Sequence, residues 1–147
     1  MEGIWQVEAF RLYAIVATIV SLHIIALALW TGSVRARRKV YVNPEDVAML
    51  KGTGGEHDHP DVLRVKRAHM NLLENAVPFL VIGALYALCS PSTLGAQAYF
   101  FTFLGARLLH SVFYLWGKQP FRTLTFAIGV LAVVGMAIHV IRVAVAA

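Results

Sequence analysis

Four long apolar runs, separated by short polar segments, make up most of this chain. Residues 12–34, for example, are apolar apart from one histidine and scattered hydroxyl groups. Runs of about 20 residues are long enough to cross the hydrocarbon core of a bilayer as helices. The pattern predicts an all-α fold: a single domain, 1–147, forming an integral membrane four-helix bundle with helices over about residues 9–37, 61–89, 96–116 and 121–145.

The connections between these runs predict the topology. The only long polar connection, residues 40–61, follows a basic run that begins at Arg35, and residues 43–46 in it are a turn or helix-start signal. The connection 90–95 carries no charge. Because basic residues are retained on the cytosolic side, we expect the first connection and the turn at Lys118 to be cytosolic and both termini to face outward.

Residues 56–61, Glu-His-Asp-His-Pro-Asp, contain side chains that bind metals elsewhere. They precede a helix in a flexible connection, however, and no helix fixes a ligand geometry. A solvated loop is therefore favoured over a metal site, and no metal is expected. Asp61 is the expected N-cap of the second long helix.

Composition agrees with a membrane protein and excludes other classes. Hydrophobic residues make up 59% of the chain and charged residues 14%, and the mean hydropathy is +0.67. The formal net charge of +5 comes from residues near the predicted membrane boundaries, which is typical of topology signals and not of nucleic-acid binding. The single cysteine, Cys89, excludes an intramolecular disulfide.

The second predicted helix carries a polar stripe. Its members follow the spacing i, i+4, i+7, i+11, which places them on one side of a helix: Arg67, Asn71, Glu74 and Pro78. Polar groups at membrane depth are costly unless they pair or face a wet cavity, so the stripe predicts a binding surface for a polar ligand. The alternative is that these residues lie in solvent just before the bilayer begins.

The third predicted helix repeats this arrangement with Arg107, His110, Ser111 and Tyr114 at i, i+3, i+4 and i+7. An arginine near the middle of a spanning helix costs at least about 2.5 kcal/mol, so we expect it to have a carboxylate partner. Glu74 is the acidic side chain at comparable depth, and an Arg107–Glu74 ion pair is predicted. Both stripes then belong to a polar pocket for a multiply charged ligand in the cytosolic half.

At these positions the chain resembles the membrane-associated proteins in eicosanoid and glutathione metabolism, the MAPEG family. It is most similar to the branch of microsomal prostaglandin E synthase and microsomal glutathione transferase. The matching motifs are Thr-Gly-Ser-Val-Arg at 31–35, Asn-Pro-Glu-Asp at 43–46, Arg-Ala-His at 67–69, and the single residues Asn71, Glu74, Pro78, Phe79, Arg107, His110, Tyr114, Pro120, Arg122 and Thr123. The first 30 residues and the last helix match only in being apolar.

The resemblance implies a homotrimer that binds glutathione between neighbouring subunits near the cytosolic side. The residues carried over as glutathione-binding are Arg67, Asn71, Glu74, His110, Tyr114 and Phe126, with Arg35 from the neighbouring subunit. Glutathione has two carboxylates and one ammonium group, so arginines and a glutamate form a charge-complementary set.

The same resemblance implies catalytic roles. Arg122 matches an arginine that stabilises the glutathione thiolate, and Thr123 supplies a hydroxyl group beside it. Asp46 matches an aspartate that can pair with this arginine, and its part in the chemistry is open. Two departures affect the substrate: Met70 replaces a further arginine of the branch, and Phe126 replaces a tyrosine.

The resemblance, with these two departures, implies a glutathione transferase or peroxidase whose lipophilic electrophile or lipid hydroperoxide enters from the membrane lipids. The alternatives are a prostaglandin E synthase-like isomerase, a non-catalytic lipid-binding member of the family, and a small transporter. The chain shows neither an internal repeat nor a pair of broken helices, which disfavours the transporter. The membrane is either a bacterial inner membrane or the endoplasmic reticulum.

Overall fold

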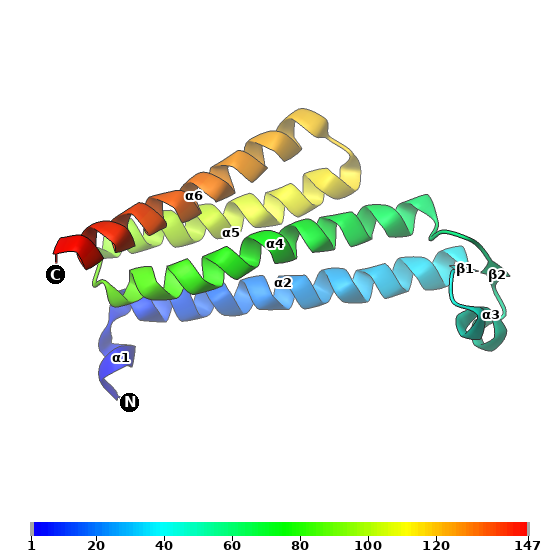
Figure 1. The fold of residues 1–147 in the computed structure, drawn as a ribbon, viewed down its shortest axis with the longest axis horizontal. Coiled ribbons are helices and arrows are strands. Elements are labelled where there is room, and N and C mark those ends of the chain that lie inside the picture. Colours follow the sequence, from blue (N-terminus) through cyan, green and yellow to red (C-terminus); the bar gives the residue numbers. More distant parts are fainter. Residues whose placement is uncertain (1, 147) are drawn as a thin grey trace.

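The computed structural model describes residues 2–146, and its framework is four long helices that run alongside one another (Figure 1). They are α2 (Glu8–Arg38), α4 (Pro60–Leu88), α5 (Thr93–Trp116) and α6 (Gln119–Ala146), preceded by a short helix, α1 (Glu2–Gln6). All four are long and apolar enough to cross a membrane, which confirms the predicted all-α membrane fold. Their bounds lie close to the predicted ones, with the largest difference at the start of α5.

Local sequence explains where the helices start and end. The N-cap of α4 is His59 and not the predicted Asp61, because the His59 Nδ1 atom accepts the backbone N–H of Asp61 at 3.2 Å. Pro60 follows at the first helical position, where a missing N–H costs nothing. At the other end of the bundle, Ser92 caps α5 by accepting the N–H of Gly95 at 3.2 Å.

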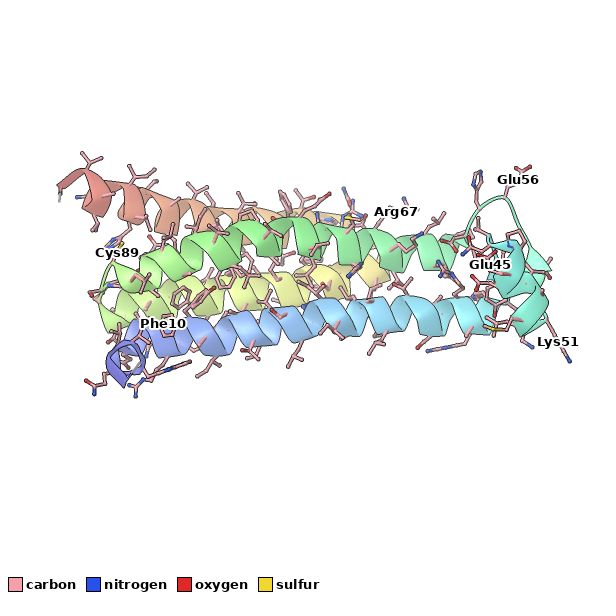
Figure 2. All side chains as sticks on the ribbon, turned by 60° about the horizontal axis from the view of Figure 1, so that its bottom comes forward. Phe10, Glu45, Lys51, Glu56, Arg67 and Cys89 are labelled. Carbon is pink, nitrogen blue, oxygen red and sulfur yellow. The ribbon has the colours of Figure 1, made fainter. Side chains whose placement is uncertain are left out.

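The connection between α2 and α4, which the sequence predicted as a flexible loop, is folded, and the predicted helix-start signal at residues 43–46 is confirmed because a helix begins there after its N-cap, Asn43. The connection contains this helix, α3 (Pro44–Leu50), and two short parallel strands, β1 (Val40–Tyr41) and β2 (Thr53–Gly54). Gly52 lies against the buried Tyr41 ring, and a Cβ atom there would come within 2.6 Å of the Lys39 carbonyl oxygen. The connection therefore packs as a compact unit at one end of the bundle, where Figure 2 shows Glu45, Lys51 and Glu56 together.

Asp58 fastens this unit to two long helices. Its side chain is only 5% exposed and accepts hydrogen bonds from Arg35 of α2, through Nε and Nη2 at 3.1 Å each, and from the Lys66 Nζ atom of α4 at 2.9 Å. The prediction of a solvated loop at residues 56–61 is therefore wrong at Asp58. Burial alone would raise the pKa of Asp58, but the hydrogen bonds and charges of Lys66 and Arg35 outweigh it and lower the pKa.

An aromatic cluster joins α2, α4 and α5 nearer the termini. The rings of Phe79 and Phe103 stack with their centroids 4.0 Å apart, and Phe100 meets Phe79 edge-on. Tyr13 of α2 packs against this cluster and donates its hydroxyl hydrogen to the Leu80 carbonyl at 2.7 Å. The three helices are thus held by ring packing with the polar tip of the tyrosine satisfied.

Arg107 is fully buried, but its partner is not Glu74, so the predicted ion pair is wrong. The Arg107 Nη2 atom donates to the Phe126 carbonyl at 3.1 Å, and the guanidinium lies 5.3 Å from the centroid of the Phe103 ring and 5.4 Å from that of Phe126. Its Nε and Nη1 atoms have no hydrogen-bond partner within residues 2–146. Cation–π contacts and one carbonyl replace the expected carboxylate.

The rotation of α4 explains this difference. Leu72 and Ala76 are buried, whereas Glu74 is exposed. Glu74 is two residues from each of them, which is about 200° around a helix of 3.6 residues per turn. Its carboxylate therefore points away from α5 and from Arg107.

Space for the Arg107 guanidinium comes from a glycine on α6. A Cβ atom at Gly129 would lie 2.6 Å from the Arg107 Nε atom and 2.7 Å from its Cζ atom. By contrast, a Cβ atom at Gly105 of α5 would meet nothing within 4 Å.

Replacing Gly129 with alanine should destabilise the protein by about 1–3 kcal/mol, because the added methyl group displaces a buried guanidinium. Gly105→Ala is the matched control and should be neutral or stabilising by up to about 1 kcal/mol, as expected for a helical alanine. Unfolding in mixed detergent micelles measures both. Equal effects of the two substitutions would contradict the described packing of Arg107.

Replacing Asp58 with asparagine should destabilise the protein by about 1–3 kcal/mol at neutral pH, because Arg35 and Lys66 lose their shared carboxylate. The folded-state pKa of Asp58 lies below its ordinary value, so its contribution is complete above about pH 4 and is lost as the pH falls through the lower folded-state value. The difference in melting temperature between wild type and variant should therefore shrink in acid. The control is Glu56→Gln, at an exposed position in the same connection, whose melting temperature should match that of wild type at every pH. If the melting-temperature difference between wild type and Asp58→Asn stays constant with pH, Asp58 does not anchor the connection through its charge.

Candidate functional site

Six of the predicted site residues line one cavity between α4, α5 and α6. Its volume is about 210 Å³, and its lining residues are Asn71, His110, Tyr114, Arg122, Thr123 and Phe126. Asn71 comes from the middle part of α4, His110 and Tyr114 are one turn apart on α5, and the others belong to the start of α6. We call this cavity the α4–α6 cavity.

Arg122 contributes a positive charge to the α4–α6 cavity. Its guanidinium lies 4.6 Å from the centroid of the Tyr114 ring, which is within the range of a cation–π contact. In the part of the chain that the structure describes, no carboxylate forms an ion pair with Arg122. The ring thus orients the guanidinium without neutralising it, and its N–H groups remain able to bind an anion.

His110 faces the same cavity in a defined tautomer. Its Nδ1 atom lies 2.9 Å from the Arg122 carbonyl oxygen. A carbonyl can only accept, so Nδ1 carries the hydrogen and Nε2 of the neutral ring is an acceptor. Nε2 is buried and has no partner among the described residues, which leaves it for a ligand's hydrogen-bond donor.

Asn71 supplies a second free acceptor. Its side-chain oxygen, Oδ1, is buried without a hydrogen-bond partner in the described chain. Buried polar groups are normally satisfied, so atoms left open in a cavity are candidates for ligand contacts. With Arg122 as donor and Asn71 and His110 as acceptors, the cavity suits a ligand that carries both an anionic group and N–H groups.

Thr125 is a further residue of this region that the sequence did not reveal. It is buried, and its hydroxyl hydrogen is shared by two carbonyl acceptors, those of Phe121 at 2.8 Å and Arg122 at 3.1 Å from the hydroxyl oxygen. The same oxygen lies 3.5 Å from the His110 Nδ1 atom. Thr125 therefore helps to hold the first turn of α6 against His110. In the sequence, the position of Thr125 one helical turn after Arg122 was the only indication that its hydroxyl group lies near the site.

Arg67 and Glu74 lie elsewhere in the single chain. Both are exposed on the outer side of α4 and neither lines the α4–α6 cavity. Figure 2 shows Arg67 on α4, and its Nε atom donates to the Leu63 carbonyl of its own helix at 3.2 Å. Within one chain, the predicted polar stripe is thus divided: Asn71 faces the cavity and the two charged residues face outward.

Arg35 and Asp46 line a different cavity, also of about 210 Å³, together with Asn43, Asp58 and Lys66. Arg35 is held there by Asp58, a contact that the sequence analysis missed. The Asp46 carboxylate accepts a hydrogen bond from the Asn43 side chain at 3.1 Å and forms no ion pair with Arg122 in the described residues. One chain therefore does not bring Arg35 or Asp46 to Arg122.

Comparison with known proteins gives the family of this chain. The MAPEG family profile matches residues 13–142. Human microsomal glutathione S-transferase 1 is 39% identical over 140 residues, which cover 92% of this chain and 90% of that protein. Horse prostaglandin E synthase is 35% identical over 136 residues (91% and 88%), and the human synthase is 34% identical over 135 residues (90% and 88%). These matches cover the greater part of all four long helices, and the chain, an integral membrane protein, belongs to the MAPEG family.

Proposed function

We propose that this protein is a glutathione-dependent membrane enzyme that activates the glutathione thiolate for conjugation to lipophilic electrophiles or for reduction of lipid hydroperoxides. The observation that carries the proposal is the Arg122 guanidinium, which has no carboxylate partner among residues 2–146 and lines a cavity with two acceptors that are unpaired in that part of the chain. Relatives named microsomal glutathione S-transferase 1 and prostaglandin E synthase support it.

The free groups of the α4–α6 cavity fit parts of glutathione. This peptide has two carboxylates, an ammonium group, two amides and a thiol. The Asn71 Oδ1 and His110 Nε2 atoms can accept its N–H groups, and Arg122 can donate to its anionic groups. Further charged residues are needed for the rest of the peptide, and in a single chain they lie outside this cavity.

We propose that a homotrimer completes the site. Glu74 is the middle residue of the 29-residue helix α4 and is exposed in the single chain, as is Arg67 two turns earlier. Charged side chains that face lipid at such depth are costly. A neighbouring copy would cover them and would bring its own Arg35 towards Arg122, so that glutathione is bound at the subunit boundary.

The proposed chemistry depends on the charge of Arg122. A free thiol has a pKa of about 8.5, and a guanidinium beside the sulfur lowers it so that thiolate is abundant at neutral pH. The thiol proton passes to water. In conjugation, the sulfur bonds to an electrophilic carbon while the leaving group departs with its electron pair. With a hydroperoxide, the thiolate sulfur attacks the terminal oxygen, the O–O bond breaks, and the alkoxide leaves and takes a proton from water to become the alcohol. The sulfenic acid of glutathione that is formed reacts with a second glutathione thiol to give the disulfide and water.

A prostaglandin E synthase-like isomerase is the second candidate, and the 34–35% identity to proteins named prostaglandin E synthase favours it. The Phe126 ring in the wall of the α4–α6 cavity, in place of a phenol, favours the transferase instead. Purified enzyme assayed with glutathione against aryl halides, epoxides, lipid hydroperoxides and prostaglandin H2 distinguishes the candidates. A non-catalytic lipid-binding protein would turn over none of them.

The basic end of the bundle is proposed to face the cytosol. The connection between α2 and α4 and the turn between α5 and α6 lie at this end, whereas both termini and the connection between α4 and α5 lie at the other (Figure 1). Lysines and arginines gather at the first end, as the positive-inside rule requires of a cytosolic side. The α4–α6 cavity would then open towards cytosolic glutathione.

Arg122→Ala should lower turnover by about 100-fold or more, because it removes the charge that stabilises the thiolate. Affinity for glutathione should stay within about tenfold, and the ultraviolet thiolate absorbance of the complex should disappear at neutral pH. Lys118→Ala, which removes an exposed charge from the adjacent turn, is the control and should behave as wild type. If Arg122→Ala keeps both turnover and thiolate signal, the proposed mechanism fails.

A shared site predicts that two inactive variants restore each other. Arg35→Ala and Arg122→Ala should each have low activity when expressed alone. Co-expression should regain a fraction of wild-type turnover, because mixed trimers contain boundaries where an intact Arg35 of one copy meets an intact Arg122 of the next. A site built within single chains would leave the mixture as inactive as the separate variants, and turnover per subunit measures the difference.

A further inference from the structure

A larger cavity lies on the opposite side of α5 from the α4–α6 cavity. Its volume is about 640 Å³, and its walls come from α2, α4 and α5, with no described residue of α6. On α5 it is lined by Val112 and Trp116, which lie on one face of the helix. His110 and Tyr114, which line the α4–α6 cavity, are two residues away and so on another face. We call the larger space the α2–α5 cavity.

Part of the α2–α5 cavity is apolar and framed by two tryptophans. Trp30 of α2 and Trp116 of α5 are 50% and 69% exposed, and Val34, Val65 and Val112 line the cavity with them. Tryptophans gather where a membrane meets water, because the ring is apolar and its N–H is polar. A volume of 640 Å³ also lies within the range of about 300–1,000 Å³ typical of ligand sites.

The rest of the lining is strongly basic. Arg37, Arg38 and Arg64 line it with a single acid, Asp61, which leaves an excess of two positive charges. Arg38 is paired with Asp61. The Arg64 Nη1 atom donates to the Leu115 carbonyl at 3.5 Å, at the end of α5. Arg37 forms no ion pair within residues 2–146.

The polar and apolar parts are ordered along the helices. Arg37 and Arg38 are the last residues of α2, and Trp30 lies about 12 Å further into the helix at 1.5 Å per residue. Val112 is likewise one turn further into α5 than Trp116, its last residue. Positive charges therefore stand at the end of the bundle, and the apolar wall continues from them into the membrane-spanning part.

We propose that the α2–α5 cavity binds a phospholipid with an anionic headgroup from the surrounding bilayer. Arg37 and Arg64 would bind the headgroup, and an acyl chain would lie along the valines and tryptophans of the lining. Charge complementarity selects an anionic lipid, since basic pockets between membrane helices recognise such headgroups. A soluble anion would leave the apolar wall uncovered, and glutathione has no apolar chain to place there.

Native mass spectrometry of the whole protein, released from vesicles with equal amounts of palmitoyl-oleoyl phosphatidylglycerol and phosphatidylcholine, tests the proposal. Wild type should retain phosphatidylglycerol in preference. Arg37→Gln/Arg64→Gln should reduce the preference by about fivefold for each arginine. Arg11→Gln/Arg142→Gln removes two exposed arginines from the opposite end of the bundle and should leave it unchanged.

A second variant tests the cavity itself with its charges intact. Val112→Trp should narrow the apolar part of the cavity and reduce retention of phosphatidylglycerol, while circular dichroism confirms an unchanged helix content. Equal retention of both lipids by wild type, or an equal loss in the control variant, would overturn the proposal. Displacement of the lipid by inorganic phosphate would indicate an anion site instead, and a change of oligomeric state in Arg37→Gln/Arg64→Gln without a lipid preference would indicate a second copy as occupant.

Discussion

Polar groups inside a hydrocarbon layer need partners, because no water is present to hydrogen-bond them. This chain carries several such groups on α4 and α5, and the ways in which they are satisfied organise the bundle. Arg107 is enclosed by the Phe126 carbonyl, two aromatic rings and the bare backbone of Gly129. That arrangement joins α5 to α6. The Asn71 and His110 acceptors stay open, and they are the groups that a ligand would satisfy.

Arg107 and Arg122 show how two arginines on neighbouring helices differ in role. Arg107 is fully buried, and α6 provides both the carbonyl that accepts its hydrogen bond and, at Gly129, the space for its guanidinium. Arg122 is only partly buried and stacks on Tyr114 at the edge of a cavity. The fully buried guanidinium of Arg107 stabilises the packing of α5 against α6, whereas the partly exposed guanidinium of Arg122 can contact a bound molecule.

The basic end of the bundle combines three arrangements of arginine. Arg35 and Lys66 share the buried Asp58 carboxylate, Arg38 is paired with Asp61, and Arg37 forms no ion pair within residues 2–146. Paired arginines fix the connection between α2 and α4 on the helices. The unpaired charges face either the α4–α6 cavity or the α2–α5 cavity, and α5 separates the two.

The amino-acid sequence by itself determined the membrane class, the four long helices and the family. Hydrophobic length is a local property, so runs of about 20 apolar residues predict spanning helices without knowledge of their neighbours. Six predicted site residues could also be brought together by their spacing on helices and by the resemblance. Only the tertiary structure decided which way each helix is rotated. Spacing places Glu74 and Arg107 on stripes of their own helices, but the packing of Leu72, Ala76 and Phe79 turns Glu74 outward. Asp58 was predicted to lie in solvent because its partners are not visible in the local sequence. Arg35 and Lys66 reach it from two different helices, and only the packing of those helices brings them together.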